Sequence, residues 1–210
     1  MYLTPFEKRQ KRIRKWRLLG QLLLGFVVLT LLDPILARLL FNPDRDYLNS
    51  KDLYTTARVV GALWIWIAIT FVLFLHDRVW DRAGSVFLAP VLAGLFAELL
   101  KRIMPRERPV DGDGLQQGWY HWREFMSGFA ESTNLGMPSS HTAVAFAGCL
   151  VLAAWMPRAR SVLLVLAIGC GISRMLTGAH FATDVYIGAL IGWACARFFE
   201  PPPPAPIRFG

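Results

Sequence analysis

Cysteine is scarce in this sequence, and the little present carries no site. The three cysteines, Cys149, Cys170 and Cys195, all lie inside long apolar runs at spacings that fit no metal site. No disulfide framework follows, and we expect small buried thiols. An internal repeat is also lacking, and the apolar runs are too closely linked to indicate a second domain. We therefore expect one domain over residues 1–210.

The apolar runs lack a polar face, which argues against a soluble helical protein. Helices on the surface of soluble proteins usually show one polar side, but a stretch such as ALWIWIAITFVLFL shows none. The chain is 54% hydrophobic, with a mean hydropathy of +0.38. Six runs approach the roughly 20 residues that cross a bilayer: Leu18–Phe41, Val59–Leu75, Ser85–Met104, Ser139–Trp155, Ser161–Leu176 and Phe181–Phe199. We predict an all-α, polytopic membrane protein with six transmembrane helices in a bundle.

A signal-peptide cleavage site is missing as well. The first apolar run is longer than the roughly 7–15 residues of a signal-peptide core, so we expect it to remain as a helix. The net charge is +8, and seven of the 23 Lys and Arg residues lie in EKRQKRIRKWR, before this run. This basic segment, residues 1–17, is typical of a cytoplasmic flank. The charge is not spread over a soluble face, which disfavours nucleic-acid binding.

Counting six crossings from a cytoplasmic N-terminus assigns each connection to one side of the membrane. HDRVWDRAG, PRAR and the Pro-rich tail, residues 200–210, then lie inside. Residues 42–58, 105–138 and 177–180 lie outside, so the long loop between the third and fourth helices is on the outer face. This loop contains WYHW, Trp119 to Trp122, whose rings suit the membrane interface. Gly188 and Gly192 form a GxxxG in the last run, which we expect to pack helices within the bundle.

The first polar cluster is KRIMPRERP, Lys101 to Pro109, at the outer end of the third run. Pro105 ends the helix, because the residue before a proline avoids the helical region. Lys101 is then in the last turn, and Arg108 is on the loop. Taken alone, the cluster favours a basic helix end that reaches lipid headgroups, with Glu98 pairing with Lys101 and Arg102. The alternative is one part of an anion site.

The second polar cluster is GMPSSHTA, Gly136 to Ala143, at the start of the fourth run. Pro138 favours a helix start, and the serines after it are natural N-caps. Capping alone explains Ser139 and Ser140. His141 adds a titratable group in the first turn, where free backbone N–H groups form a ready site for an anion.

The third polar cluster is ISRMLTGAHFATDVYIG, Ile172 to Gly188. It places Arg174, His180 and Asp184 between two apolar runs, where charge is costly and ionisable residues are functional candidates. His180 and Asp184 are four residues apart and share a helix face if one helix includes both. A carboxylate bonded to one imidazole nitrogen fixes the tautomer and leaves the other nitrogen free to act.

By the span count, the three clusters emerge on the same outer side. Their cations and helix start suit an oxyanion with several charges, most simply phosphate. The histidine next to a carboxylate suits a nucleophile, and the other can protonate the leaving oxygen and later activate water. Because the cations already neutralise the phosphoryl oxygens, the site needs no metal. The residues are Lys101, Arg108 and Arg174 as cations, Ser139 and Ser140 at the helix start, and the histidines His141 and His180.

The spacing of these three clusters resembles the three motifs of the membrane type-2 phosphatidic acid phosphatase superfamily. The matching patterns are Lys101–(six residues)–Arg108–Pro109, then Pro138–Ser139–Ser140–His141, then Ser173–Arg174–(five residues)–His180–(three residues)–Asp184. They cover the middle and C-terminal half of the chain. One departure is Ser140, where the family often has glycine. A serine still supplies its backbone N–H, so we expect activity to be kept.

The resemblance implies a six-helix, metal-independent phosphatase of lipid phosphates or diphosphates, without a cofactor. His180 would form a phosphohistidine, Asp184 would orient it, and His141 would be the acid and then the base. The phosphate would be held by Lys101, Arg108, Arg174, Ser139 and the backbone near Ser140. Arg102 and Arg106 are expected to steer anionic headgroups towards the pocket.

The resemblance also implies a bacterial inner membrane, with both termini in the cytoplasm and the active site on the outer face. The candidate substrates are phosphatidylglycerophosphate, phosphatidate, polyprenyl diphosphates such as undecaprenyl diphosphate, and lipid A phosphates. The expected partners are this lipid and the bilayer, with no obligatory protein partner. Two alternatives stay open: a lipid phosphotransferase, and a non-catalytic scaffold or transporter that retains a phosphate pocket.

Overall fold

A computed structural model describes residues 4–77, 80–109 and 120–201 of the chain, and every regular element in these ranges is helical. Residues 110–119, which include Trp119, lie outside the described residues, and so does most of the tail 200–210. The all-α class is confirmed for the described part. The helices are α1 (Pro5–Leu40), α2 (Arg45–Asn49), α3 (Asp52–Val59), α4 (Leu63–Asp77), α5 (Trp80–Ile103), η1 (Ser127–Phe129), α7 (Ser140–Trp155), η2 (Pro157–Ala159), α8 (Arg160–Leu176) and α9 (Ala182–Phe198).

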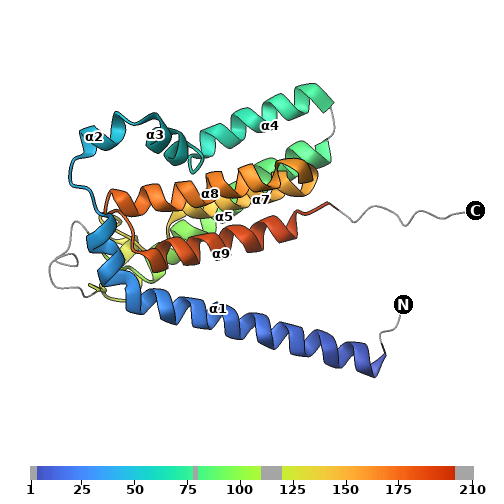
Figure 1. Ribbon diagram of the computed structural model, residues 1–210, viewed down its shortest axis with the longest axis horizontal. Helices are drawn as coiled ribbons and strands as arrows, with labels where there is room; N and C mark the ends of the chain where they lie inside the picture. Colours follow the sequence, from blue (N-terminus) through green and yellow to red (C-terminus); the bar gives the residue numbers. More distant parts are fainter. Residues whose placement is uncertain (1–3, 78–79, 110–119, 202–210) are drawn as a thin grey trace, which may run out of the picture.

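The bundle is organised around α7, which packs against α5, α8 and α9. Figure 1 shows these helices running side by side, with α4 along one flank and α1 along the other. α4 packs on α5, and α1 packs on α9. Apart from the short α2, α3, η1 and η2, the helices therefore form one bundle with α7 inside it.

α1 is longer than the predicted first span, because the basic segment before Leu18 is also helical. Thr4 caps the helix in a capping box with Glu7, and the Lys and Arg residues that follow are good helix formers. Along α1 many large apolar side chains are exposed, including Leu24, Leu31 and Leu39. Such a surface suits contact with lipid.

The second predicted span is broken. α3 and α4 meet at a bend of 73° around Gly61. A Cβ at Gly61 would lie 2.8 Å from Cβ of His141, so only glycine permits this close approach to α7. The predicted continuous run Val59–Leu75 therefore begins at the last residue of α3, passes through the bend and continues as α4 from Leu63.

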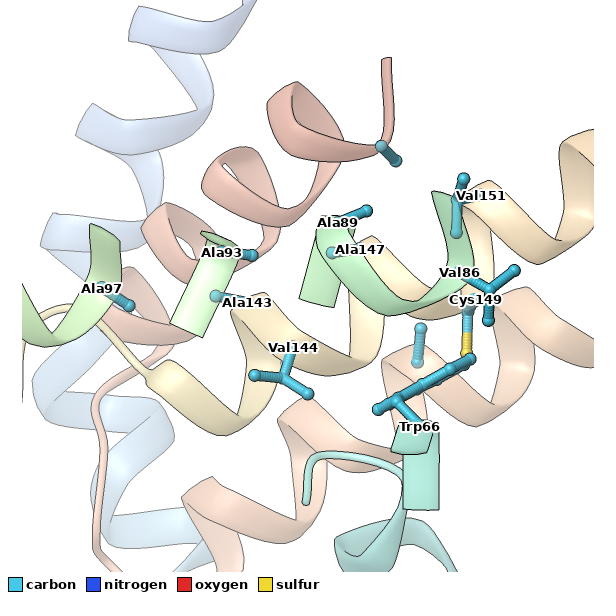
Figure 2. Packing of buried hydrophobic residues seen from close by; sticks show 12 residues of the cluster. Trp66, Val86, Ala89, Ala93, Ala97, Ala143, Val144, Ala147, Cys149 and Val151 are labelled. Carbon is cyan, nitrogen blue, oxygen red and sulfur yellow. The ribbon is translucent and has the colours of Figure 1, made fainter. Parts of the chain in front are cut away.

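The apolar core is built from small side chains. Ala93 of α5 and Ala143 and Ala147 of α7 are fully buried and face one another between the helices, as Figure 2 shows. A Cβ on Gly188 would lie 2.5 Å from the backbone oxygen of Ser139, the N-cap of α7, and a Cβ on Gly192 would lie 2.5 Å from that of Ala143 in α7. These glycines therefore pack α9 against α7 within the bundle, as predicted. Small residues let helix backbones approach closely and hold the bundle in one arrangement.

In the described part of the chain, three helices are long and apolar enough to cross a bilayer: α1, α5, and α8 taken with η2. The bent pair of α3 and α4 is a fourth candidate. α7 has 16 residues and α9 has 17, fewer than the roughly 20 that span the hydrocarbon core. A helix occupies each of the six predicted runs, but six crossings stay a prediction.

Candidate active site

The three polar clusters lie at one end of the bundle, on the left in Figure 1. Lys101 is in the last turn of α5 and Arg174 in the last turn of α8. Ser140 begins α7, and Asp184 is in the first turn of α9. The antiparallel course of these helices brings together residues up to 83 positions apart (184 − 101). The span count predicted this shared end.

His180 and Asp184 are neighbours, although one helix does not include both. α9 begins at Ala182 with Phe181 as its N-cap, so His180 belongs to the preceding loop. Asp184 Oδ2 accepts the N–H of Phe181 at 2.8 Å and lies 3.8 Å from His180 Nδ1. Asp184 is fully buried, and His180 is 3% exposed. Burial lowers the pKa of His180 to about 4, so its imidazole is neutral at neutral pH.

The start of α7 is bonded to the start of α9. Ser139 is the N-cap, and its Oγ accepts the N–H of Thr142 at 3.4 Å, as its predicted capping role requires. The N–H of Ser139 donates to the carbonyl oxygen of Asp184 at 3.0 Å. Ser140 is the first helical residue, and its Oγ accepts Lys101 Nζ at 3.2 Å.

Three cations converge on this end. Lys101 is buried, and its Nζ donates to Glu98 Oε1 at 2.9 Å, which confirms the predicted pair. Arg108 Nε donates to the carbonyl oxygen of Leu135 at 3.3 Å. Arg174 Nε is buried without a hydrogen-bond partner among the described residues. Arg108 acts electrostatically on both Lys101 and Arg174. Like charges held this close favour binding of a polyanion between them.

His141 lies among these charges and beside a cavity. The charges of Arg174 and Lys101 act on its ring. A cavity of about 390 Å³ adjoins His141 and Ser140 between α4, α5 and α7. Its remaining lining is Glu98 together with small or apolar residues: Gly61, Ala62, Leu63, Val91, Gly94, Leu95 and Val144. The cavity therefore joins the polar residues to the apolar middle of the bundle.

Arg106 belongs to the site, which the sequence interpretation missed. Its side chain is 2% exposed and forms an ion pair with Asp184 Oδ1. The same nitrogen, Nη2, donates to Thr183 Oγ1 at 2.9 Å. The Arg106 guanidinium also lies over the ring of Tyr120, 4.5 Å from its centroid. The expectation that Arg106 steers headgroups is wrong, because this buried, paired cation does not face solvent. Arg102 is exposed, and its steering role stays a prediction.

Asp33 of α1 is the second residue that was missed. It is fully buried, and its Oδ1 accepts the backbone N–H of Thr183 at 3.0 Å. Its Oδ2 accepts the hydroxyls of Thr183 and, at 2.8 Å, of Tyr120. Burial, and then the bond to Asp33, raise the pKa of Tyr120 to about 12, so this hydroxyl keeps its proton. An acidic residue inside an apolar run is a functional candidate, and that signal was present in the run Leu18–Phe41.

Metal ligands were not expected from the sequence. Among the described residues, no group of three or more His, Cys, Asp or Glu side chains is placed to hold a metal ion. Cys149 and Cys170 are buried free thiols, as expected, whereas the free thiol Cys195 is only partly buried. Metal-independent chemistry stays a prediction.

Two curated relatives are similar to this chain over most of its length. Lipid A 1-phosphatase of Rhizobium etli is 30% identical over 176 residues, which cover 83% of this chain and 66% of the relative. Lipid A 1-phosphatase of Rhizobium johnstonii is 28% identical over 174 residues, covering 83% of this chain and 62% of the relative. The chain thus spans slightly less than two thirds of the length of these relatives.

Two solved structures share the fold. Aquifex aeolicus LpxE has a TM-score of 0.60 and 24% identity, covering 80% of this chain and 94% of that one. A transmembrane PAP2 type phosphatidylglycerolphosphate phosphatase of Bacillus subtilis has a TM-score of 0.58 and 20% identity, covering 89% of this chain and 98% of that one. Residues 82–200, which carry all three polar clusters, match the PAP2 superfamily. The chain therefore belongs to the PAP2 superfamily.

Proposed function

We propose that the protein is an integral membrane lipid phosphatase that transfers a phosphoryl group first to His180 and then to water. The observation that carries this proposal is the convergence of a buried histidine–carboxylate pair with three cations at one end of an apolar bundle. The two parts are His180 with Asp184, and Lys101, Arg108 and Arg174.

Binding of the phosphate falls to the cations and the start of α7. Arg174 Nε, which has no partner among the described residues, is available to a phosphoryl oxygen. Lys101 is already held by Glu98 and Ser140, so its ammonium is fixed before the substrate arrives. Fixed donors stabilise the charge of the transition state without reorganising. The N–H groups near Ser140 add the positive end of the helix dipole.

The first chemical step is attack by His180 on phosphorus. Asp184 faces Nδ1, which leaves Nε2 as the attacking atom. A bond forms between Nε2 and phosphorus as the bond from phosphorus to the lipid oxygen breaks. The low pKa of His180, about 4 because of burial, supports this role, since only the neutral imidazole has a free electron pair. Asp184 then stabilises the positive charge that develops on the ring.

We assign the proton transfer in each of the two chemical steps to His141. In the first step it donates a proton to the departing lipid oxygen, which leaves as an alcohol. In the second step it accepts a proton from water, whose oxygen attacks phosphorus and breaks the bond to Nε2 of His180. Both His141 and His180 then return to their starting protonation states. The place of His141 in the first turn of α7, at the same end of the bundle as His180, supports their action on one phosphate.

The substrate that we propose is a lipid A-type phosphate monoester. The cavity beside His141 supports a lipid, because its apolar lining suits an acyl chain next to the reacting group. The two Rhizobium relatives are named lipid A 1-phosphatases, which favours a lipid A phosphate over the other three classes. Phosphatidylglycerophosphate is the next candidate, because the Bacillus subtilis protein of the same fold is named for it.

The orientation that we propose places the site on the outer face of a bacterial inner membrane. The basic residues Lys8 to Arg17 lie in the first turns of α1, at the opposite end of the bundle from His180 (Figure 1). Lys and Arg near the ends of spans favour the cytoplasm. Both termini are then cytoplasmic.

The experiment is phosphate release by the purified protein in detergent with excess chelator, for all four lipid classes. His180→Ala is the test variant, and His121→Ala, an exposed histidine, is the matched control. We expect release from lipid A 1-phosphate that survives chelation, is lost in His180→Ala and is kept in His121→Ala. Loss of release on chelation would contradict the metal-independent mechanism. Release that requires an added lipid alcohol would instead indicate a phosphotransferase.

A further inference from the structure

Asp33 has a buried, fully hydrogen-bonded carboxylate next to the candidate active site. It lies in α1, outside residues 82–200 that match the family, yet its carboxylate is fully buried. Burying a carboxylate is costly unless it is hydrogen-bonded or paired. Three donors meet it: the N–H and hydroxyl of Thr183 and the hydroxyl of Tyr120. Two of the three come from the residue immediately before Asp184.

Thr183 connects Asp33 to Arg106 in a fixed direction. Its Oγ1 accepts Arg106 Nη2 at 2.9 Å, and its single hydroxyl proton goes to Asp33 Oδ2. Its backbone N–H donates to the other carboxylate oxygen at 3.0 Å. Arg106 therefore donates to Thr183, and Thr183 donates to Asp33, with no alternative arrangement that satisfies all three residues.

Arg106 extends this chain of bonds to Asp184. Nη2 has two protons, so it can bond Thr183 and Asp184 Oδ1 at the same time. The other carboxylate oxygen, Oδ2, accepts the N–H of Phe181 and faces His180 Nδ1. With both oxygens engaged, the Asp184 carboxylate cannot rotate and keeps Oδ2 directed at His180.

We infer that Asp33 is a positioning residue for the His180–Asp184 pair and acts through Thr183 and Arg106. The inference rests on the proposed function, in which His180 is the nucleophile. It gives α1 a part in turnover in addition to its place in the bilayer. Since a misplacement of about 1 Å can cost on the order of 10²-fold in rate, Asp33→Asn is expected to lower kcat by roughly 10- to 100-fold. KM is expected to stay almost unchanged, because Asp33 does not contact the phosphate site.

A double-mutant cycle separates positioning from a purely structural role. It compares kcat for Asp33→Asn, Asp184→Asn and the double variant, with Asp46→Asn of the exposed α2 as matched control. If Asp33 acts through Asp184, replacing Asp33 should change kcat little in a protein that already carries Asp184→Asn. The double variant should then lie within about threefold of Asp184→Asn, since residues in one network do not add. A double variant whose loss equals the product of the two single losses would overturn the inference.

A matched pair at Thr183 tests the same connection without changing a charge. Thr183→Val keeps the shape but removes the hydroxyl between Arg106 and Asp33, whereas Thr183→Ser keeps the hydroxyl. We expect kcat to fall in Thr183→Val by as much as in Asp33→Asn, and to be largely retained in Thr183→Ser. Equal activity of the two variants would count against the inference. This pair also serves if Asp33→Asn fails to fold.

A readout that needs no turnover distinguishes failure of the inference from failure of the proposed function. Diethyl pyrocarbonate modifies neutral imidazoles, and mass spectrometry reports its rate at His180. We expect modification of His180 to be several-fold faster in Asp33→Asn than in the wild type or Asp46→Asn. If the wild type releases no phosphate but this acceleration is seen, the proposed function fails and the positioning role stands. If the wild type is active and Asp33→Asn matches Asp46→Asn in both kcat and modification, the inference is overturned and the function stands.

Discussion

At the end of the bundle that carries His180, many of the buried side chains are polar or charged, whereas the middle is filled mainly by small apolar residues such as alanine and valine. Of the ten buried polar or charged residues in the described part of the chain, all except Ser85 lie at that end. In the middle, α5 and α7 touch through residues such as Ala93 and Ala143. Close packing holds the helices together, and directional hydrogen bonds set the geometry of the site. Substitutions at the polar end should therefore lower activity, whereas substitutions in the middle should lower stability.

The largest effect is expected at the polar end, from Asp184→Asn. An asparagine amide would donate towards His180 Nδ1 and favour the wrong tautomer of the ring, which in a comparable triad costs about 10⁴-fold in kcat. We expect a loss on that order in phosphate release, with KM changed little. A loss smaller than about tenfold would mean that Asp184 does not orient the nucleophile.

In the middle of the bundle, Trp66→Ala is expected to lower stability rather than chemistry. Trp66 is 2% exposed and packs against Gly148, and its Nε1 donates to the carbonyl oxygen of Val60 at 2.8 Å. Replacing such a ring costs about 3–5 kcal/mol of unfolding free energy, which unfolding in SDS would measure. The matched control is Trp64→Ala, whose side chain is 59% exposed. Equal losses in the two variants would contradict the assigned packing.

Lys101 is buried and its neighbour Arg102 is exposed, so replacing each in turn compares a buried contact with an exposed one. Lys101→Met removes a buried ammonium bonded to Ser140, and a charged hydrogen bond is worth about 1.5–3 kcal/mol. We expect kcat/KM to fall roughly 10- to 100-fold, since each 1.4 kcal/mol is about tenfold. Arg102→Ala removes an exposed charge and should lower kcat/KM only about two- to threefold, an effect that salt abolishes. A loss in Lys101→Met that disappeared at high salt would contradict its direct role.

A smaller effect concerns the pH dependence of His180. Arg174, Lys101 and Asp184 surround it, and burial lowers its pKa to about 4. The ring is then neutral above about pH 5, and the unfolded chain, with a pKa near 6.5, binds this proton more tightly. Stability should therefore fall as the pH drops from about 6.5 towards 4. NMR of labelled histidines, assigned with His180→Gln, should show this titration, and a midpoint near 6.5 would contradict the burial.

Most of the site could be predicted from the sequence because its residues lie at fixed spacings near helix ends. Once the apolar runs fix the direction of each helix, Lys101, Ser139 and Arg174 must emerge at one end of the bundle. The structure brings these residues together with His180 and Asp184, as expected. What the spacing could not give is the exact start of α9, because Phe181 and not His180 is the N-cap.

The network behind the site could not be predicted in the same way. Arg106 lies among other cations in KRIMPRERP, and nothing local indicates that it turns inward to Asp184. Asp33 meets Thr183 across 150 residues, so this contact depends on where α1 packs. The break at Gly61 was hidden for a similar reason, since the glycine is needed only because His141 lies against it.

Rapid quenching shows whether His180 carries the phosphoryl group during turnover. The wild-type protein would be mixed with lipid A 1-phosphate labelled with ³²P, stopped in alkali after milliseconds, digested and mapped by mass spectrometry. We expect an alkali-stable, acid-labile label on His180 that disappears in His180→Ala. Because His141 acts in both steps, the label should form and decay more slowly if His141 is replaced by alanine. Turnover with the label on another residue, or with no labelled protein at any time point, would contradict this role of His180.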